Sequence, residues 1–136
     1  MAKECGLDGI RLDNDYFRGC YCSTCEQAFR DYLQRRYTDS ESRRIFGLRT
    51  LAGVGFVPVD LPSDPMWSEM VVFRQQQRQQ VMRRLSRKVR EVNPDAILGG
   101  NPAVSRSPED VWRRHVYPPD LGETHHLVCA ENSLFP

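Results

Sequence analysis

Three short apolar segments that end in acids or amides constrain the fold of this chain most strongly. Their polar ends carry Asp13, Asn101 and Glu131. Helical patterns separate the segments, and strands that alternate with helices pair in parallel through right-handed crossovers. The sequence therefore predicts an α/β fold with three parallel strands and intervening helices. The predicted strands are residues 7–14, 96–102 and 125–132.

Helix signals fill the spaces between these strands. Ser23 and Glu26 have the spacing of a capping box and open a helix that runs to about Tyr37. Shorter helices are predicted at about 40–46 and 108–114. The Gly- and Pro-containing stretch that follows residue 46 is predicted to be a long surface loop.

A long helix is predicted from Pro65 to Asn93. Asp64 caps its start, and the Asn93-Pro94 pair ends it. The helical period predicts a buried seam along this helix, formed by Trp67, Met70, Phe73, Val81, Leu85, Val89 and Val92.

Length and composition limit the class of protein. The chain has 136 residues with 40% hydrophobic content, which suffices for one domain. Its 19 Lys and Arg against 18 Asp and Glu favour no nucleic-acid partner, and the basic residues from Arg83 to Arg90 fit the solvated face of a helix. No signal peptide and no apolar run of ~20 residues is visible, so we expect a soluble, cytoplasmic protein with no membrane partner.

A C-x-C-x-x-C motif indicates a metal site. Cys20, Cys22 and Cys25 are spaced so that a loop entering a helix turns the three sulfurs inward. Zinc binds four such ligands in a tetrahedron, so the motif predicts a structural zinc that needs one further ligand. A closed thiolate set leaves no open position, and no cofactor is expected for catalysis. Free or oxidised cysteines are the alternative.

The polar strand ends predict a second site. In parallel α/β folds, functional residues gather at the carboxyl ends of the strands. Strand alternation favours Asp13 as the carboxylate of this rim and leaves Asp15 as its rival, with Glu131 reaching toward it from the third strand. The alternative is that these residues only form turns or cap helices.

One segment also resembles a known family. "DNDYFRGCYCSTCEQAFRDYLQRRY" is similar to the fourth-strand segment of family 42 β-galactosidases, where Asn-Glu-Tyr precedes Cys-Tyr-Cys-x-x-Cys and a helix. The later "FR" at Phe73-Arg74, "NPDAILGGNP" and "LVCAEN" follow in the order of the next two family strands, so the resemblance extends along nearly the whole chain. It implies a (β/α)₈ TIM barrel that cleaves glycosides with two carboxylates. Residues 1–136 would be a fragment of one such domain, about strands four to six.

The resemblance also assigns residues. It places Asn14 on the family's Asn and Asp15 on its acid/base Glu, one methylene shorter. The nucleophile and a fourth thiolate would lie on strands that this chain lacks, so the chain alone is expected to be inactive. Two other functions remain open: a non-catalytic carbohydrate-binding barrel and a zinc-knuckle interaction module. The predicted site residues are Asp13, Asp15 and Glu131 for catalysis, Asn14, Asn101 and Asn132 for substrate, and Cys20, Cys22 and Cys25 for metal.

Overall fold

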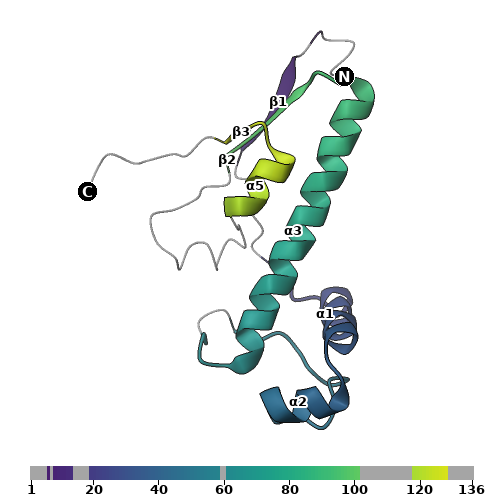
Figure 1. Cartoon of the computed structure of the whole chain (residues 1–136), viewed down its shortest axis with the longest axis vertical. Coiled ribbons are helices and arrows are strands. Elements are labelled where there is room, and N and C mark those ends of the chain that lie inside the picture. Colours follow the sequence, from purple (N-terminus) through teal and green to yellow (C-terminus); the bar gives the residue numbers. More distant parts are fainter. Residues whose placement is uncertain (1–5, 7, 14–18, 59–60, 102–117, 129–136) are drawn as a thin grey trace, which may run out of the picture. The chain divides into compact units, whose positions relative to one another are not determined.

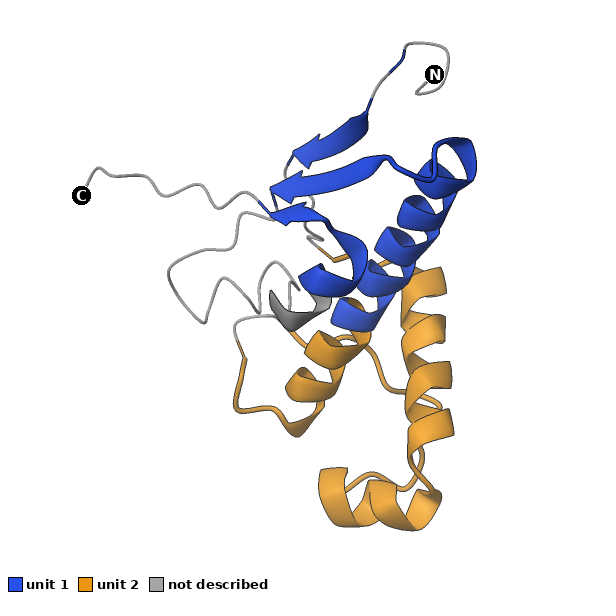
Figure 2. Cartoon of the chain, turned by 45° about the horizontal axis from the view of Figure 1, so that its top comes forward, with its two compact units in different colours: residues 1–18, 75–136 blue, residues 19–74 orange. Residues whose placement is uncertain are grey.

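The structure is a computed structural model that describes residues 6, 8–13, 19–58, 61–101 and 118–128 (Figure 1). The chain divides into two compact units (Figure 2). We call residues 1–18 with 75–136 the sheet unit and residues 19–74 the helical unit. The elements in chain order are β1 (Gly9–Asp13), α1 (Ser23–Arg36), α2 (Asp39–Phe46), α3 (Pro65–Val92), β2 (Ile97–Asn101), α5 (Pro118–Thr124) and β3 (Leu127–Val128).

The sheet unit confirms the predicted parallel pairing. Its three strands lie in the order β1-β2-β3, and both neighbouring pairs are parallel. Gly9 of β1 lies opposite Ile97, and a Cβ on Gly9 would lie 2.6 Å from the Ile97 carbonyl oxygen, so this register favours glycine. The described strands form an open parallel sheet within an α/β fold, and they do not show the predicted barrel.

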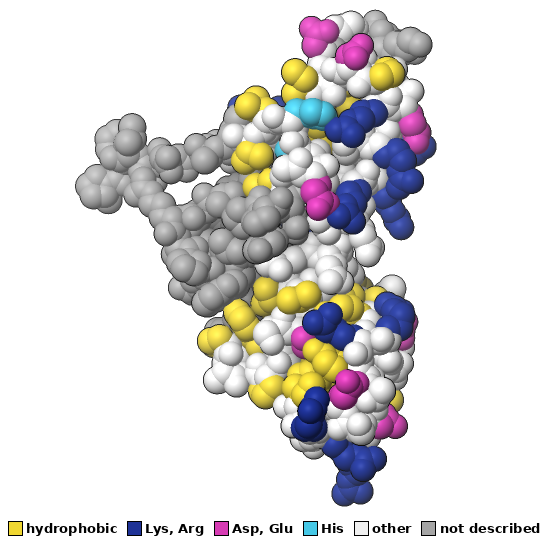
Figure 3. Space-filling model, in the orientation of Figure 1, with side chains coloured by type: hydrophobic (Ala, Val, Ile, Leu, Met, Phe, Trp, Pro, Cys, Tyr) yellow, Lys and Arg dark blue, Asp and Glu magenta, His cyan; other side chains and the backbone are white. Residues whose placement is uncertain are grey.

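The part of α3 in the sheet unit agrees only in part with the predicted seam. Val81 and Val92, predicted to be buried, are each 45% exposed. Val89 is buried as predicted, and Met82 and Ser86, which were not predicted, are buried with it; the three repeat every three or four residues, as one face of a helix does. The prediction followed hydrophobicity alone and therefore passed over Ser86. The basic residues between 83 and 90 are exposed as predicted, and Figure 3 shows Lys and Arg side chains along the side where Figure 1 places α3.

The helical unit has its own apolar core. Phe29 of α1 is fully buried and stacks on Phe56 at 5.1 Å between ring centroids, while Phe73 of α3 lies 5.3 Å from the Phe29 ring. Leu51 and Val57 are also buried, so the segment predicted to be a surface loop contributes to this core. Its apolar residues remove more surface from water by packing on the aromatic side chains than by facing solvent.

Helix capping in the helical unit differs from the prediction. Helix α1 begins at Ser23 itself, with Cys22 at the N-cap and no side-chain cap hydrogen bond, so the predicted Ser23 capping box is wrong. The same signature occurs at Thr38 and Glu41, where the structure forms a full capping box for α2. There the Thr38 Oγ1 accepts a hydrogen bond from the Glu41 N–H at 3.3 Å, and the Thr38 N–H donates to the Glu41 carboxylate at 2.8 Å.

Replacing Thr38 with alanine is expected to lower the free energy of unfolding by about 1 kcal/mol, because one backbone donor of α2 loses its acceptor. Urea unfolding followed by circular dichroism measures this change. Thr38→Ser keeps the hydroxyl and is the matched control, for which we expect a smaller loss. Equal losses in the two variants would show that the hydroxyl does not cap α2.

The remaining boundaries agree with the predictions or add to them. Helix α3 begins at Pro65, and the Asp64 carboxylate accepts a hydrogen bond from the Met66 N–H at 2.7 Å, which confirms the predicted cap. Helix α5 was not predicted, and the predicted helix at 108–114 lies outside the described residues. No helix in the described part of the chain is both long and apolar enough to cross a membrane.

Candidate functional site

The carboxyl ends of β1 and β2 bring two predicted site residues together. Asp13 and Asn101 are register partners, and the Asn101 Nδ2 donates a hydrogen bond to the Asp13 Oδ1 at 3.1 Å. Asn101 is only 1% exposed, so its amide is held in place by the surrounding sheet unit. The other rim residues lie outside the described residues: Asn14, Asp15, Glu131 and Asn132.

The two histidines stand at the amino end of β3. The His126 N–H donates to the Leu98 carbonyl at 2.8 Å, and the Leu98 N–H donates to the His126 Nδ1 at 3.1 Å. His126 thus aligns the start of β3 with β2. The carboxyl ends of the parallel strands lie at the other end of the sheet, as the sequence predicted.

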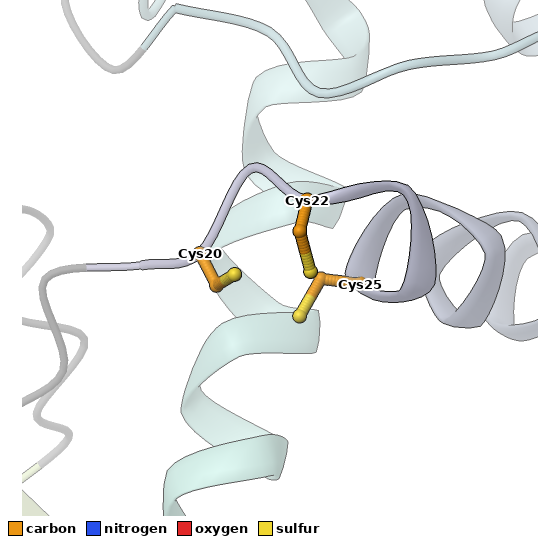
Figure 4. Close-up of side chains that lie close together, drawn as sticks. All are labelled: Cys20, Cys22 and Cys25. Atoms are coloured by element: carbon orange, nitrogen blue, oxygen red, sulfur yellow. The ribbon is translucent and has the colours of Figure 1, made fainter.

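The three cysteines of the motif lie together in the helical unit. Cys20 and Cys22 belong to the loop before α1, and Cys25 lies in the first turn of this helix. Figure 4 shows the three side chains turned toward one another. Their sulfur atoms all lie within 4.8 Å of one another, and all three are free thiols. We call Cys20, Cys22 and Cys25 the cysteine cluster.

The cysteine cluster fits a thiolate-bound metal. Zinc binds sulfur at ~2.3 Å, so a tetrahedral site needs sulfur atoms about 3.8 Å apart. A small contraction of the cluster would reach this spacing. Cys20 and Cys22 are exposed and Cys25 is half-buried, so an ion can approach from solvent. The three residues could therefore hold a metal such as zinc, with one tetrahedral position left for a further ligand.

The thiols of the cluster differ in acidity. Hydrogen bonds from the backbone N–H of Cys25 and from the side chains of Cys20 and Cys25 lower the pKa of Cys22 to about 7. Burial and the neighbouring thiols raise the pKa of Cys25 to about 11. A metal that binds the cluster at neutral pH must therefore displace the proton of Cys25, while Cys22 is already partly a thiolate.

Sequence reasoning missed one residue beside the cluster. Arg74 of α3 is 2% exposed, and its guanidinium Nη2 donates a hydrogen bond to the Cys20 carbonyl at 3.2 Å. Its local sequence, inside a polar stretch of α3, resembles that of an exposed arginine. The signal that could have found it is the apolar seam, because Arg74 directly follows the buried Phe73.

Comparison with known proteins finds a family model that matches part of the chain. The family model of the β-galactosidases of glycoside hydrolase family 42 matches residues 2–47. The chain is similar to that family over this segment. The matched segment includes Asp13 and the whole cysteine cluster and ends at Gly47, the residue that caps α2. The predicted resemblance reached much further along the chain, and the match does not extend to β2 or β3. No curated protein and no solved structure matches the chain.

Proposed function

We propose that the chain is part of a glycoside hydrolase related to the family 42 β-galactosidases. The observation that carries this proposal is the family match over residues 2–47, because that segment holds both Asp13 and the cysteine cluster. The parallel sheet supports it, since parallel α/β enzymes place their sites at the carboxyl ends of the strands. The three described strands would belong to a larger barrel.

The proposed substrate is a carbohydrate that binds at the carboxyl ends of β1 and β2. A carboxylate offers about four acceptor sites, so we propose that Asp13, which accepts a hydrogen bond from Asn101, also accepts one from a sugar hydroxyl. Glycoside cleavage needs two carboxyl groups at a fixed separation. We propose Asp13 or Asp15 for one role and Glu131 for the other, with Asn14 and Asn132 as further substrate contacts.

The proposed role of the cysteine cluster is to hold a structural zinc ion. When bound, the metal would cross-link the loop to the first turn of α1, and Cys20, Cys22 and Cys25 would be its ligands in this chain. Helix α1 carries no side-chain N-cap, so its first turn lacks the stabilisation that the capping box gives to α2. The metal ligands would fix that turn instead.

A zinc-binding interaction module is the second candidate. The cluster lies in a unit with its own aromatic core, and such a unit could fold and bind a partner without a carbohydrate site. Sugar binding at Asp13 distinguishes the two candidates, because the module would have no carbohydrate ligand.

A sugar titration of the full chain tests the carbohydrate proposal. Isotope-labelled chain titrated with an aryl β-galactoside is expected to show NMR shift changes centred on Asp13 and Asn101. Asp13→Asn should weaken this binding about tenfold or more, the cost of losing a hydrogen bond to a charged group. The substituted asparagine keeps an oxygen that can accept from Asn101, so the sheet contact is preserved.

The matched control is Asp8→Asn, which removes the same charge before the amino end of β1. It should leave sugar binding unchanged. Absence of shift changes at the carboxyl ends of β1 and β2, or equal effects of the two variants, would contradict the carbohydrate proposal and favour the interaction module.

A further inference from the structure

Arg74 is a buried cation that packs against two aromatic rings in the helical unit. Its guanidinium carbon lies 4.6 Å from the centroid of the Tyr21 ring and 4.3 Å from that of Phe56. The two rings themselves meet edge to face at 5.6 Å. Tyr21 stands between Cys20 and Cys22 in the chain, so the arginine packs directly against the loop of the cysteine cluster.

Two further observations tie Arg74 to this loop. Its Nη2 donates to the Cys20 carbonyl, and a Cβ placed on Gly19 would lie 1.7 Å from its Nη1. Gly19 has a φ of +80°, so the chain uses a residue without a side chain at the point where the guanidinium needs room. The backbone before the cysteine cluster is thus shaped around Arg74.

The charge of Arg74 is incompletely matched. Its Nε is buried, and within the described part of the chain it has no hydrogen-bond partner. A buried donor without an acceptor is costly, and a buried cation without a counter-charge is more so. No carboxylate pairs with this arginine among the described ion pairs, and burial lowers the pKa of its guanidinium.

We propose that Arg74 is a positioning residue for the metal–thiolate centre, fixing the loop of Cys20 and supplying the positive charge that balances the bound cluster. This inference rests on the proposed metal site. When a divalent ion binds, the protons that remain on the three cysteines go to solvent and three metal–sulfur bonds form. Three thiolates and one divalent ion together carry a net charge of −1. A neighbouring guanidinium favours the charged product over the neutral thiols, and it does so more strongly where little water screens it.

A Co²⁺ titration of the full chain at pH 7 tests this role, because thiolate–cobalt charge-transfer bands report sulfur ligation directly. Arg74→Met is expected to weaken Co²⁺ binding about tenfold to 100-fold, the usual cost of removing a residue that supports metal ligands. Arg74→Lys restores the charge without the planar guanidinium, so it should recover part of the affinity. Arg49→Met removes an exposed charge from the same unit and should have no effect.

A second pair of variants leaves the arginine in place and disturbs its position. Gly19→Ala should displace the guanidinium and weaken Co²⁺ binding. Gly47→Ala is its control, because Gly47 has a similar φ of +70° but no atom within 4 Å of the added Cβ. Both alanines strain the backbone alike, so only the clash with Arg74 separates them. Circular dichroism of the metal-free variants shows whether each one is folded.

The outcomes separate the two proposals. Weaker binding in Arg74→Met and Gly19→Ala, with partial recovery in Arg74→Lys and unchanged controls, supports the role of Arg74. If the charge-transfer bands gave the same Co²⁺ affinity for wild type, Arg74→Met and Gly19→Ala, this role of Arg74 would be overturned, and the metal site would still be supported. Arg74→Lys binding no better than Arg74→Met would overturn the charge argument. Absence of the bands in the wild-type chain would overturn the metal site and this inference together.

Discussion

Replacing Cys22 with serine is expected to lower the affinity of the chain for Zn²⁺ by about 100-fold or more. Loss of a residue that only supports a metal ligand costs about 10- to 100-fold, and loss of a ligand itself should cost at least as much. Cys22 is a ligand in our proposal, and its thiol has a pKa lowered to about 7 by the hydrogen bonds around it. A serine hydroxyl stays protonated at pH 7 and is a poor ligand for zinc. Competition with a chromophoric zinc chelator measures the change.

The control for this variant is Ser23→Ala, which alters the exposed neighbour of Cys22 without touching a thiol. It should bind zinc as the wild-type chain does. If Cys22→Ser retained wild-type affinity, the metal would have to bind elsewhere, and the cysteine cluster would be a group of unliganded thiols.

Truncating Phe29 to alanine is expected to cost about 3–5 kcal/mol of unfolding free energy, because a large aromatic side chain leaves a cavity in the core. Phe29 is fully buried and lies at the centre of the aromatic cluster, with the Tyr32, Phe56 and Phe73 rings within 6.2 Å. Phe56, which stacks on Phe29, also packs against Arg74. Loss of the Phe29 ring should therefore also loosen the packing next to the cysteine cluster.

Urea unfolding of the full chain measures this loss. Phe29→Leu keeps most of the buried volume and is expected to cost about 1 kcal/mol. A loss below about 1 kcal/mol for Phe29→Ala would show that the ring is not a central part of the core.

The sheet and its polar end could be predicted because they depend on local patterns. Three patterns carried the prediction: the alternation of residues in the first strand, the apolar period of α3 and the cap at Asp64. Each of them involves residues that are only a few positions apart in the sequence. Parallel pairing follows from the order of these elements. The juxtaposition of Asp13 with Asn101 then required no knowledge of the rest of the chain.

The features that could not be predicted from the sequence depend on contacts between residues that are far apart along the chain. Arg74 is buried because Tyr21 and Phe56, far away along the chain, enclose its guanidinium. Helix α5 contains two prolines and a glycine, which weaken the local helix signal, and burial of Leu121 and Thr124 favours the helix instead. The capping-box signature occurs at both Ser23 and Thr38, and local pattern gives no means of choosing between them.

The most direct test of the proposed metal site is X-ray absorption at the zinc edge of the zinc-loaded chain. We expect a shell of about three sulfur atoms at ~2.3 Å, because three thiolates of the cluster surround the ion. The same measurement on Cys22→Ser should lose one sulfur. A shell of only nitrogen and oxygen atoms at ~2.0–2.2 Å in the wild-type chain would contradict the proposal that Cys20, Cys22 and Cys25 bind the metal.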